Sequence, residues 1–123
     1  CPYNHPNFPD GFLRTSVRQL SWFARAYLNG GVLDGRRILE ESTIREMLQA
    51  QVAGASRTQG LTWYASSSVR GQEVWGHGGS DPGVNTDIRL VPEERVPAIV
   101  FINTWGGNPA QITQYLLEQA SNF

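Results

Sequence analysis

The sequence contains no lysine, and all ten of its basic residues are arginine. The absence of lysine excludes any site that depends on a lysine amine, including a Ser-x-x-Lys nucleophile motif. Cysteine occurs only as Cys1, so no internal disulfide can form. No apolar run approaches the roughly 18 residues that span a bilayer, and no positively charged start followed by an apolar stretch indicates a signal peptide. Hydrophobic residues at 40% and charged residues at 17% lie within the range of soluble proteins, so we expect a soluble globular protein.

An excess of charge of one sign is also missing, because ten basic residues stand against eleven acidic ones and give a net charge of -1. Binding to phosphate backbones needs a basic patch or stripe, so we expect no nucleic-acid partner. The two histidines and the single cysteine show no ligand spacing such as His-Glu-x-x-His. We therefore expect no metal site.

The 123 residues, 40% of them hydrophobic, are enough for one domain with a core. Three prolines and the turn signal Pro9-Asp10-Gly11 predict an extended, linker-like segment over residues 1–11, followed by the domain over residues 12–123. A capping-box pattern at Ser16 and Gln19 precedes apolar residues at helical spacing, which predicts a helix over residues 17–29.

The next segments predict a hairpin and a second helix. Asp34-Gly35 supports a tight turn between two short strands within residues 32–39. Ser42 and Thr43 are expected to cap a helix that ends near Gln51.

From Leu61 the hydrophobic period changes from that of a helix to that of a strand. Strand-like runs joined by short turns cover residues 61–65, 74–77, 84–91 and 96–102. A last helix begins at Asn108-Pro109, and its stripe of Ile112, Tyr115, Leu116 and Ala120 is expected to face the sheet. The predicted fold class is α+β: an antiparallel sheet of at least three strands packed by a C-terminal helix and preceded by two helices and a small hairpin.

The segment from Trp75 to Gly83 is the strongest candidate for a functional site. His77 stands beside Gly78 and Gly79, and these glycines let another surface approach the backbone. Ser80 and Asp81 follow, before Pro82-Gly83 turns the chain. Backbone N–H groups at such a strand edge can stabilise an oxyanion. The alternatives are a hydrogen-bonded structural histidine and a β-bulge without function.

A Ser-His-Asp triad from Ser80, His77 and either Asp81 or Asp87 is disfavoured. Residues three apart on a strand point to opposite faces, and no Gly-x-Ser-x-Gly motif occurs. The tryptophans, at positions 22, 63, 75 and 105, are expected in the core or in a cleft wall.

Several segments resemble, in order, the C-terminal portion of the serine β-lactamase and penicillin-binding protein superfamily. The nearest branch is the class C-like group with esterases and D-aminopeptidases, in which a His-x-Gly triad replaces Lys-Thr-Gly. The resemblance extends over nearly the whole chain, and its segments are Leu13 to Leu20, Leu28 to Gly31, Gly76 to Gly83, Ile88 to Pro92 and Val100 to Asn103.

The resemblance implies roles for the candidate residues. His77, Gly78 and Gly79 would form the family's third motif on a strand that lines the cleft, and His77 would bind or polarise the substrate. The backbone N–H of Ser80 would donate to the oxyanion, and Gly78, Gly79 and Asp81 would contact the substrate. The family's nucleophile motif Ser-x-x-Lys is absent, and so is Tyr-x-Asn.

The resemblance therefore implies part of a serine hydrolase that cleaves amides or esters through an acyl-enzyme, without metal or organic cofactor, and that is inactive alone. It covers β-lactam, peptide and ester substrates, and it favours an extracytoplasmic bacterial location. The family's sheet has two further strands from the N-terminal part of the protein. The run Val96 to Asn103 would then be an apolar edge that pairs with the missing part or with a second copy.

Two other functions fit the same residues. The chain could be a non-catalytic binding or interaction module that keeps the fold without the nucleophile. It could also be a small structural domain with a fortuitous histidine-glycine loop, in which case His77 would be buried.

Overall fold

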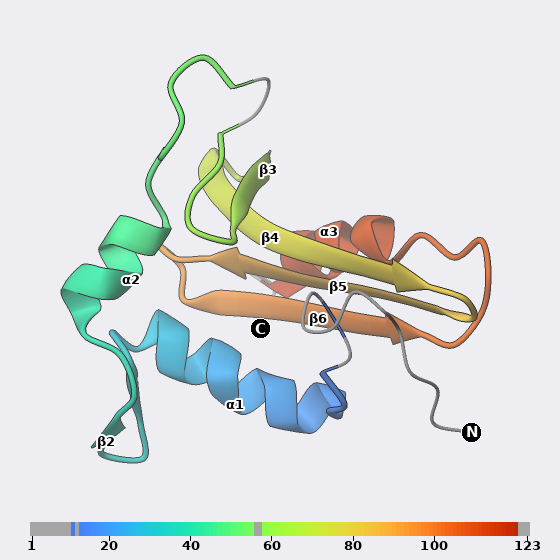
Figure 1. Cartoon of the computed structure of the whole chain (residues 1–123), viewed down its shortest axis with the longest axis horizontal. Helices are drawn as coiled ribbons and strands as arrows, with labels where there is room; N and C mark the ends of the chain where they lie inside the picture. Colours follow the sequence, from blue (N-terminus) through green and yellow to red (C-terminus); the bar gives the residue numbers. More distant parts are fainter. Residues whose placement is uncertain (1–10, 12, 56–57, 121–123) are drawn as a thin grey trace.

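The computed structural model describes residues 11, 13–55 and 58–120 (Figure 1). In this part of the chain, three α-helices accompany a two-stranded and a four-stranded antiparallel sheet. The predicted α+β class is confirmed. The linker-like segment expected over residues 1–11 lies outside the described residues, except for Gly11.

The main sheet is a meander in the order β3-β4-β5-β6. Its strands are β3 (Tyr64–Val69), β4 (Gln72–Asp81), β5 (Val84–Val91) and β6 (Val96–Ile102). The register places His77 opposite Ile88 and Asp87 opposite Val100. Each strand is joined to the next by a tight turn, as the sequence predicts.

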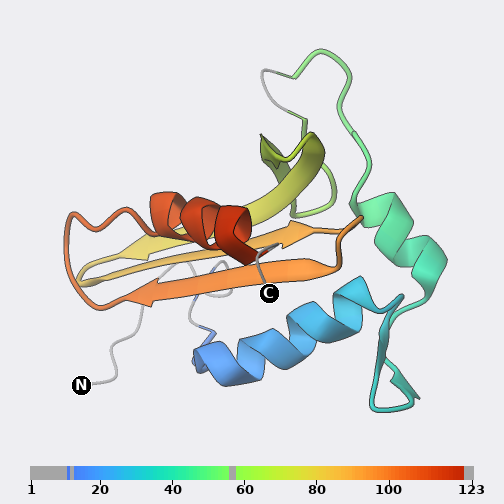
Figure 2. The same ribbon diagram turned by 180° about the vertical axis from the view of Figure 1, so that it is seen from behind.

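The two faces of this sheet carry separate hydrophobic clusters. Helix α1 (Val17–Leu28) contributes Ala24 and Tyr27 to one cluster, with Trp75 and Leu90 from the sheet. Helix α3 (Pro109–Gln119) contributes Leu117 to the other, together with Val69, Val74, Val91 and Ala98. In Figure 1 α3 lies behind the sheet, and Figure 2 brings it to the front. Alternation along the strands therefore buries successive residues on opposite faces.

Helix α1 and the following hairpin agree with their sequence signals. The Ser16 hydroxyl accepts the Gln19 N–H at 3.2 Å, and the Gln19 side chain accepts the Ser16 N–H at 3.1 Å, which completes the capping box. The hairpin pairs β1 (Val32–Leu33) with β2 (Arg36–Arg37). Its turn residues Asp34 and Gly35 have φ of 48° and 78°, which are the left-handed values that such a turn requires.

The second helix and the first strand of the main sheet differ from the prediction. Helix α2 spans Glu41–Met47 with Glu40 as its N-cap, so Ser42 and Thr43 lie inside the helix rather than capping it. The strand predicted over residues 61–65 begins only at Tyr64 and continues to Val69. Thr62, at φ 67°, bends the chain immediately before the strand.

The face of α3 that packs on the sheet is not the predicted one. Thr113 and Leu117 are fully buried, whereas Ile112, Tyr115 and Leu116 are 44%, 60% and 44% exposed. Thr113 donates its hydroxyl to a buried carboxylate of the sheet, and Leu117 packs in the cluster with Val74 and Val91, so the side of the helix that carries these two residues lies against the sheet. The apolar stripe of α3 consequently faces outward.

Strand β6 forms one edge of the main sheet, and α1 contacts it. Among the described residues, no helix is both long and apolar enough to cross a membrane.

Candidate functional site

The candidate site is a length of β4 that has a partner strand on one side only. On one side residues 75–81 pair continuously with β5. On the other side the pairing with β3 ends at Tyr64 opposite Gly76. In the part of the chain that the structure describes, no strand pairs with residues 77–81 along this second edge. We call residues 77–81 at this edge the open edge of β4.

The backbone groups that face the open edge follow from the hydrogen bonds around Tyr64. Ala65 N–H donates to Thr58 O at 3.0 Å, and Gly60 N–H donates to Trp63 O at 2.8 Å, so both neighbours of Tyr64 point away from β4. Tyr64 must then direct its own backbone groups toward Gly76, its partner on β4.

Alternation continues this direction along β4, because every second residue points its N–H and C=O to the same edge. Gly78 and Ser80 therefore present their backbone groups at the open edge, past the last β3–β4 pair, which is Tyr64 with Gly76. His77, Gly79 and Asp81 direct theirs toward β5. Donors and acceptors without a partner strand can bind an extended ligand or a developing oxyanion.

The His77 side chain is exposed, and its ring centroid lies 5.8 Å from that of Tyr64, at an interplanar angle of 35°. His77 is therefore not a buried structural histidine, which the alternative of a fortuitous histidine-glycine loop requires. The two aromatic rings stand together at the start of β3, where the open edge of β4 begins.

The other predicted residues lie on the same strand but do not converge on His77. Alternation places the Ser80 side chain on the opposite face of the sheet from that of His77. The Ser80 hydroxyl donates to Asn85 Oδ1 at 2.8 Å, and Asn85 Nδ2 donates to Thr104 O at 3.0 Å. Asp81 is half-buried at the end of the strand, opposite Val84. This arrangement leaves the Ser80 backbone, rather than its hydroxyl, at the open edge.

Side chains at Gly78 and Gly79 would point to opposite faces of the sheet. A Cβ added to Gly78 would lie 3.5 Å from Asp87 Oδ1, and one added to Gly79 would lie 2.8 Å from Thr86 Oγ1. The strand runs through both glycines in continuous register with β5, so they form no bulge there.

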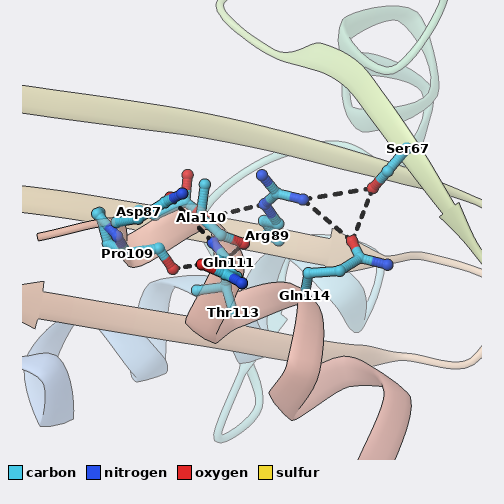
Figure 3. A network of polar contacts seen from close by, with 9 residues as sticks. Ser67, Asp87, Arg89, Pro109, Ala110, Gln111, Thr113 and Gln114 are labelled. Carbon is cyan, nitrogen blue, oxygen red and sulfur yellow. Dashed lines mark hydrogen bonds and ion pairs between the residues drawn. The ribbon is translucent and has the colours of Figure 1, made fainter.

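Five polar residues gather on the face of the sheet covered by α3, and of these the sequence analysis considered only Asp87, as a possible triad member. They are Asp87 and Arg89 of β5, Thr113 and Gln114 of α3, and Ser67 of β3 (Figure 3). Alternation on β5 marks Asp87 and Arg89 as sharing a face, but a buried polar face and a solvent-facing one have the same pattern in sequence.

A cavity of about 690 Å³ lies away from the open edge. Its lining includes Gln72, Glu73 and Trp75 from the start of β4, Tyr27 from α1 and Ile44 from α2. None of residues 77–81 lines it. The open edge carries the exposed histidine and the backbone groups that have no partner strand among the described residues, so we place the candidate site at the open edge.

The Tyr27 hydroxyl beside this cavity is buried and makes no hydrogen bond of acceptable geometry within the described part of the chain. Burial raises the pKa of Tyr27, and the neighbouring Trp63 indole lowers it in part. An indole N–H can only donate, so Trp63 offers no acceptor for the hydroxyl proton. Over residues 11, 13–55 and 58–120, no cluster of three or more metal-ligating side chains occurs.

Comparison with known proteins finds a likeness among solved structures. No protein-family model matches the sequence, and no curated protein matches it. Among solved structures, the octameric penicillin-binding protein homologue from Pyrococcus abyssi superposes with a TM-score of 0.73 over 88% of this chain, at 21% sequence identity. The chain has a penicillin-binding-protein-like fold. It spans about a quarter of the matched chain, 24% of its length.

Proposed function

We propose that the open edge of β4, with His77, lines one side of an acyl-transfer site in a β-lactamase-like serine hydrolase. The observation that carries the proposal is the open edge of β4, where no strand of the described residues pairs with the backbone groups of Gly78 and Ser80, beside an exposed histidine. The penicillin-binding-protein-like fold adds support, because it gives an independent reason to consider acyl transfer.

In this proposal the nucleophile belongs to polypeptide outside the 123 residues, since the sequence has no lysine with which to build Ser-x-x-Lys. A serine Oγ would bond to the carbonyl carbon of an amide or ester, and the amine or alcohol would leave. Water would then hydrolyse the acyl-enzyme. The Ser80 N–H would donate to the oxyanion, an interaction worth about 3 kcal/mol. His77 would bind or polarise the carbonyl side of the substrate, with Gly78, Gly79 and Asp81 in contact with it.

The proposal is tested with a chromogenic cephalosporin and a p-nitrophenyl ester. We expect no saturable turnover from the purified chain, and turnover when it is joined to the polypeptide encoded immediately upstream. In the joined protein, His77→Gln should lower kcat/KM by about 100-fold, in the range of lost acid–base or electrostatic groups. Glu73→Gln, near the other end of the same strand, is the matched control and should leave kcat/KM unchanged.

Turnover by the chain alone would contradict the proposal. So would an upstream coding sequence without a Ser-x-x-Lys motif. That second result would favour a non-catalytic binding module, the candidate that the absence of lysine supports.

We also propose that the outer edge of β6 is covered by another strand, either from a second copy or from further polypeptide of the same protein. The support is that β6 ends the sheet at Val96–Ile102 and that the outer face of the neighbouring α3 exposes Ile112, Tyr115 and Leu116. Light scattering during size-exclusion chromatography separates the cases. If the chain alone is a dimer, a second copy covers the edge. If the protein is a monomer only after it is joined to the upstream polypeptide, that polypeptide covers the edge. A stable dilute monomer of the chain alone contradicts both.

A further inference from the structure

A buried ion pair lies directly behind the candidate site. Arg89 Nε donates to Asp87 Oδ2 at 2.8 Å, and their side chains are 12% and 8% exposed. The Thr113 hydroxyl of α3 donates to the same carboxylate oxygen. Asp87 is thereby fixed between its own strand and the helix.

Arg89 extends this contact across the sheet. Its Nη1 donates to Gln114 Oε1 at 3.1 Å and to Ser67 Oγ at 3.3 Å, and the Ser67 hydroxyl donates to the same Gln114 oxygen at 2.9 Å (Figure 3). Arg89 belongs to β5 and Ser67 to β3, and β4 lies between these strands. The Arg89 side chain therefore crosses the back of β4. We call Ser67, Asp87, Arg89, Thr113 and Gln114 the back network.

Strand β4 gives no side chain to the back network, and its glycines lie opposite the two charged members. Gly76 pairs with Arg89, and Gly78 pairs with Asp87. A Cβ at Gly78 would already be in van der Waals contact with the Asp87 carboxylate, at 3.5 Å from Oδ1. These two glycines are the neighbours of His77 on either side, so the back network packs on the backbone that carries the imidazole.

We propose that the back network positions the open edge of β4. Resting on the proposed function, this inference makes Asp87, Arg89 and Thr113 positioning residues. They touch no substrate, and they hold the backbone of residues 76–78 against α3 and β3, so that His77 and the Ser80 N–H keep a fixed arrangement. A strand that pairs on one side only is held by fewer hydrogen bonds than one with two partner strands, and an oxyanion donor is effective only when it is preorganised.

The test measures backbone motion by ¹⁵N relaxation, without any substrate. Thr113→Val removes the hydroxyl and keeps the shape, whereas Thr113→Ser keeps the hydroxyl. We expect Thr113→Val to lower the order parameters of Gly78 and Ser80 from about 0.85 toward about 0.6, the range that separates rigid from flexible backbone. Thr113→Ser should restore the values of the unaltered protein.

Two further variants keep the test decisive. Ser67→Ala removes an exposed contact of Arg89 and should raise mobility at Gly78 and Ser80 in the same direction, even if Thr113→Val fails to fold. The control is Glu94→Gln, which removes one partner of the Arg70–Glu94 ion pair. This pair joins the β3–β4 turn to the β5–β6 turn, away from the open edge, so the variant should leave these order parameters unchanged.

Unchanged order parameters at Gly78 and Ser80 in the folded network variants would overturn the proposal, as would an equal loss in Glu94→Gln. Because motion is measured without substrate, a negative result here is distinct from a failure of the turnover assay, which tests the proposed function itself.

Discussion

The orientation of α3 gives the sharpest test of the fold, because adjacent leucines occupy opposite environments. Leu117 is fully buried in the cluster with Val74 and Val91, and Leu116 is 44% exposed. The substitution to alanine is the same at both positions and on the same helix, so the change in helix propensity cancels. Any difference in stability then reports burial.

The magnitudes follow from that burial. Leu117→Ala loses the whole transfer free energy of the side chain and leaves a cavity, and we expect a loss of about 3 kcal/mol from the free energy of unfolding. Leu116→Ala loses roughly half of a full transfer free energy and opens to solvent without a cavity, so we expect about 1 kcal/mol.

The assay is urea denaturation followed by tryptophan fluorescence, because Trp63 and Trp75 are buried in the other cluster and report global unfolding. With a slope of about 2 kcal/mol per molar urea, the two variants should differ in midpoint by about 1 M. The measurement is made at low protein concentration, so that association through the exposed face of α3 does not contribute. Equal losses, or a larger loss in Leu116→Ala, would refute the orientation of α3 and restore the stripe of Ile112, Tyr115 and Leu116 as the buried face.

Two further predictions concern single polar groups. Arg70 lowers the pKa of Glu94 below its ordinary value of 4.5, so this pair stabilises the fold above that value and the contribution is lost as the pH falls through the lowered pKa. Urea titrations from pH 7 to pH 3 should therefore show a smaller acid-induced loss of stability in Glu94→Gln, and an identical loss would contradict the pair's role. Tyr27→Phe removes a buried hydroxyl that has no acceptor among the described residues, and it should leave the free energy of unfolding unchanged or raise it by about 1 kcal/mol, whereas a decrease of that size would mean that the hydroxyl is bonded.

Local signals in the sequence were sufficient to predict an element where both interacting residues lie close together in the chain. The capping box of Ser16 and Gln19 and the turn at Asp34-Gly35 depend on residues close in sequence, and both form as predicted. The predicted caps of α2 fail because Ser42 and Thr43 are taken into the helix, whose first residue is Glu41. A hydroxyl can cap only where the backbone leaves the helix, and that point is set by how the preceding loop packs.

The orientation of α3 could not be predicted from periodicity, because periodicity counts only apolar residues. Ile112, Tyr115 and Leu116 form the better apolar stripe, but Thr113 faces the sheet. The hydroxyl of Thr113 donates to the buried Asp87 carboxylate, and buried polar groups are stabilised when their hydrogen bonds are made, so the side of the helix that carries Thr113 faces the sheet. The decisive partner is 26 residues away in sequence, so no local pattern contains it.

For the candidate site, the sequence identifies the glycines but not the distinct contacts that each makes. Gly78 faces the Asp87 carboxylate, whereas a Cβ at Gly79 would meet the Thr86 hydroxyl at 2.8 Å on the other face. Only Gly79 is therefore required for packing of β4 against β5, because a Cβ at Gly78 would lie at an ordinary contact distance of 3.5 Å from Asp87 Oδ1. Access to the backbone comes from the start of β3 at Tyr64, where its pairing with β4 ends. The extent of the open edge thus depends on where β3 begins, and that point follows the bend at Thr62 and the bonds of Tyr64's neighbours to the preceding loop.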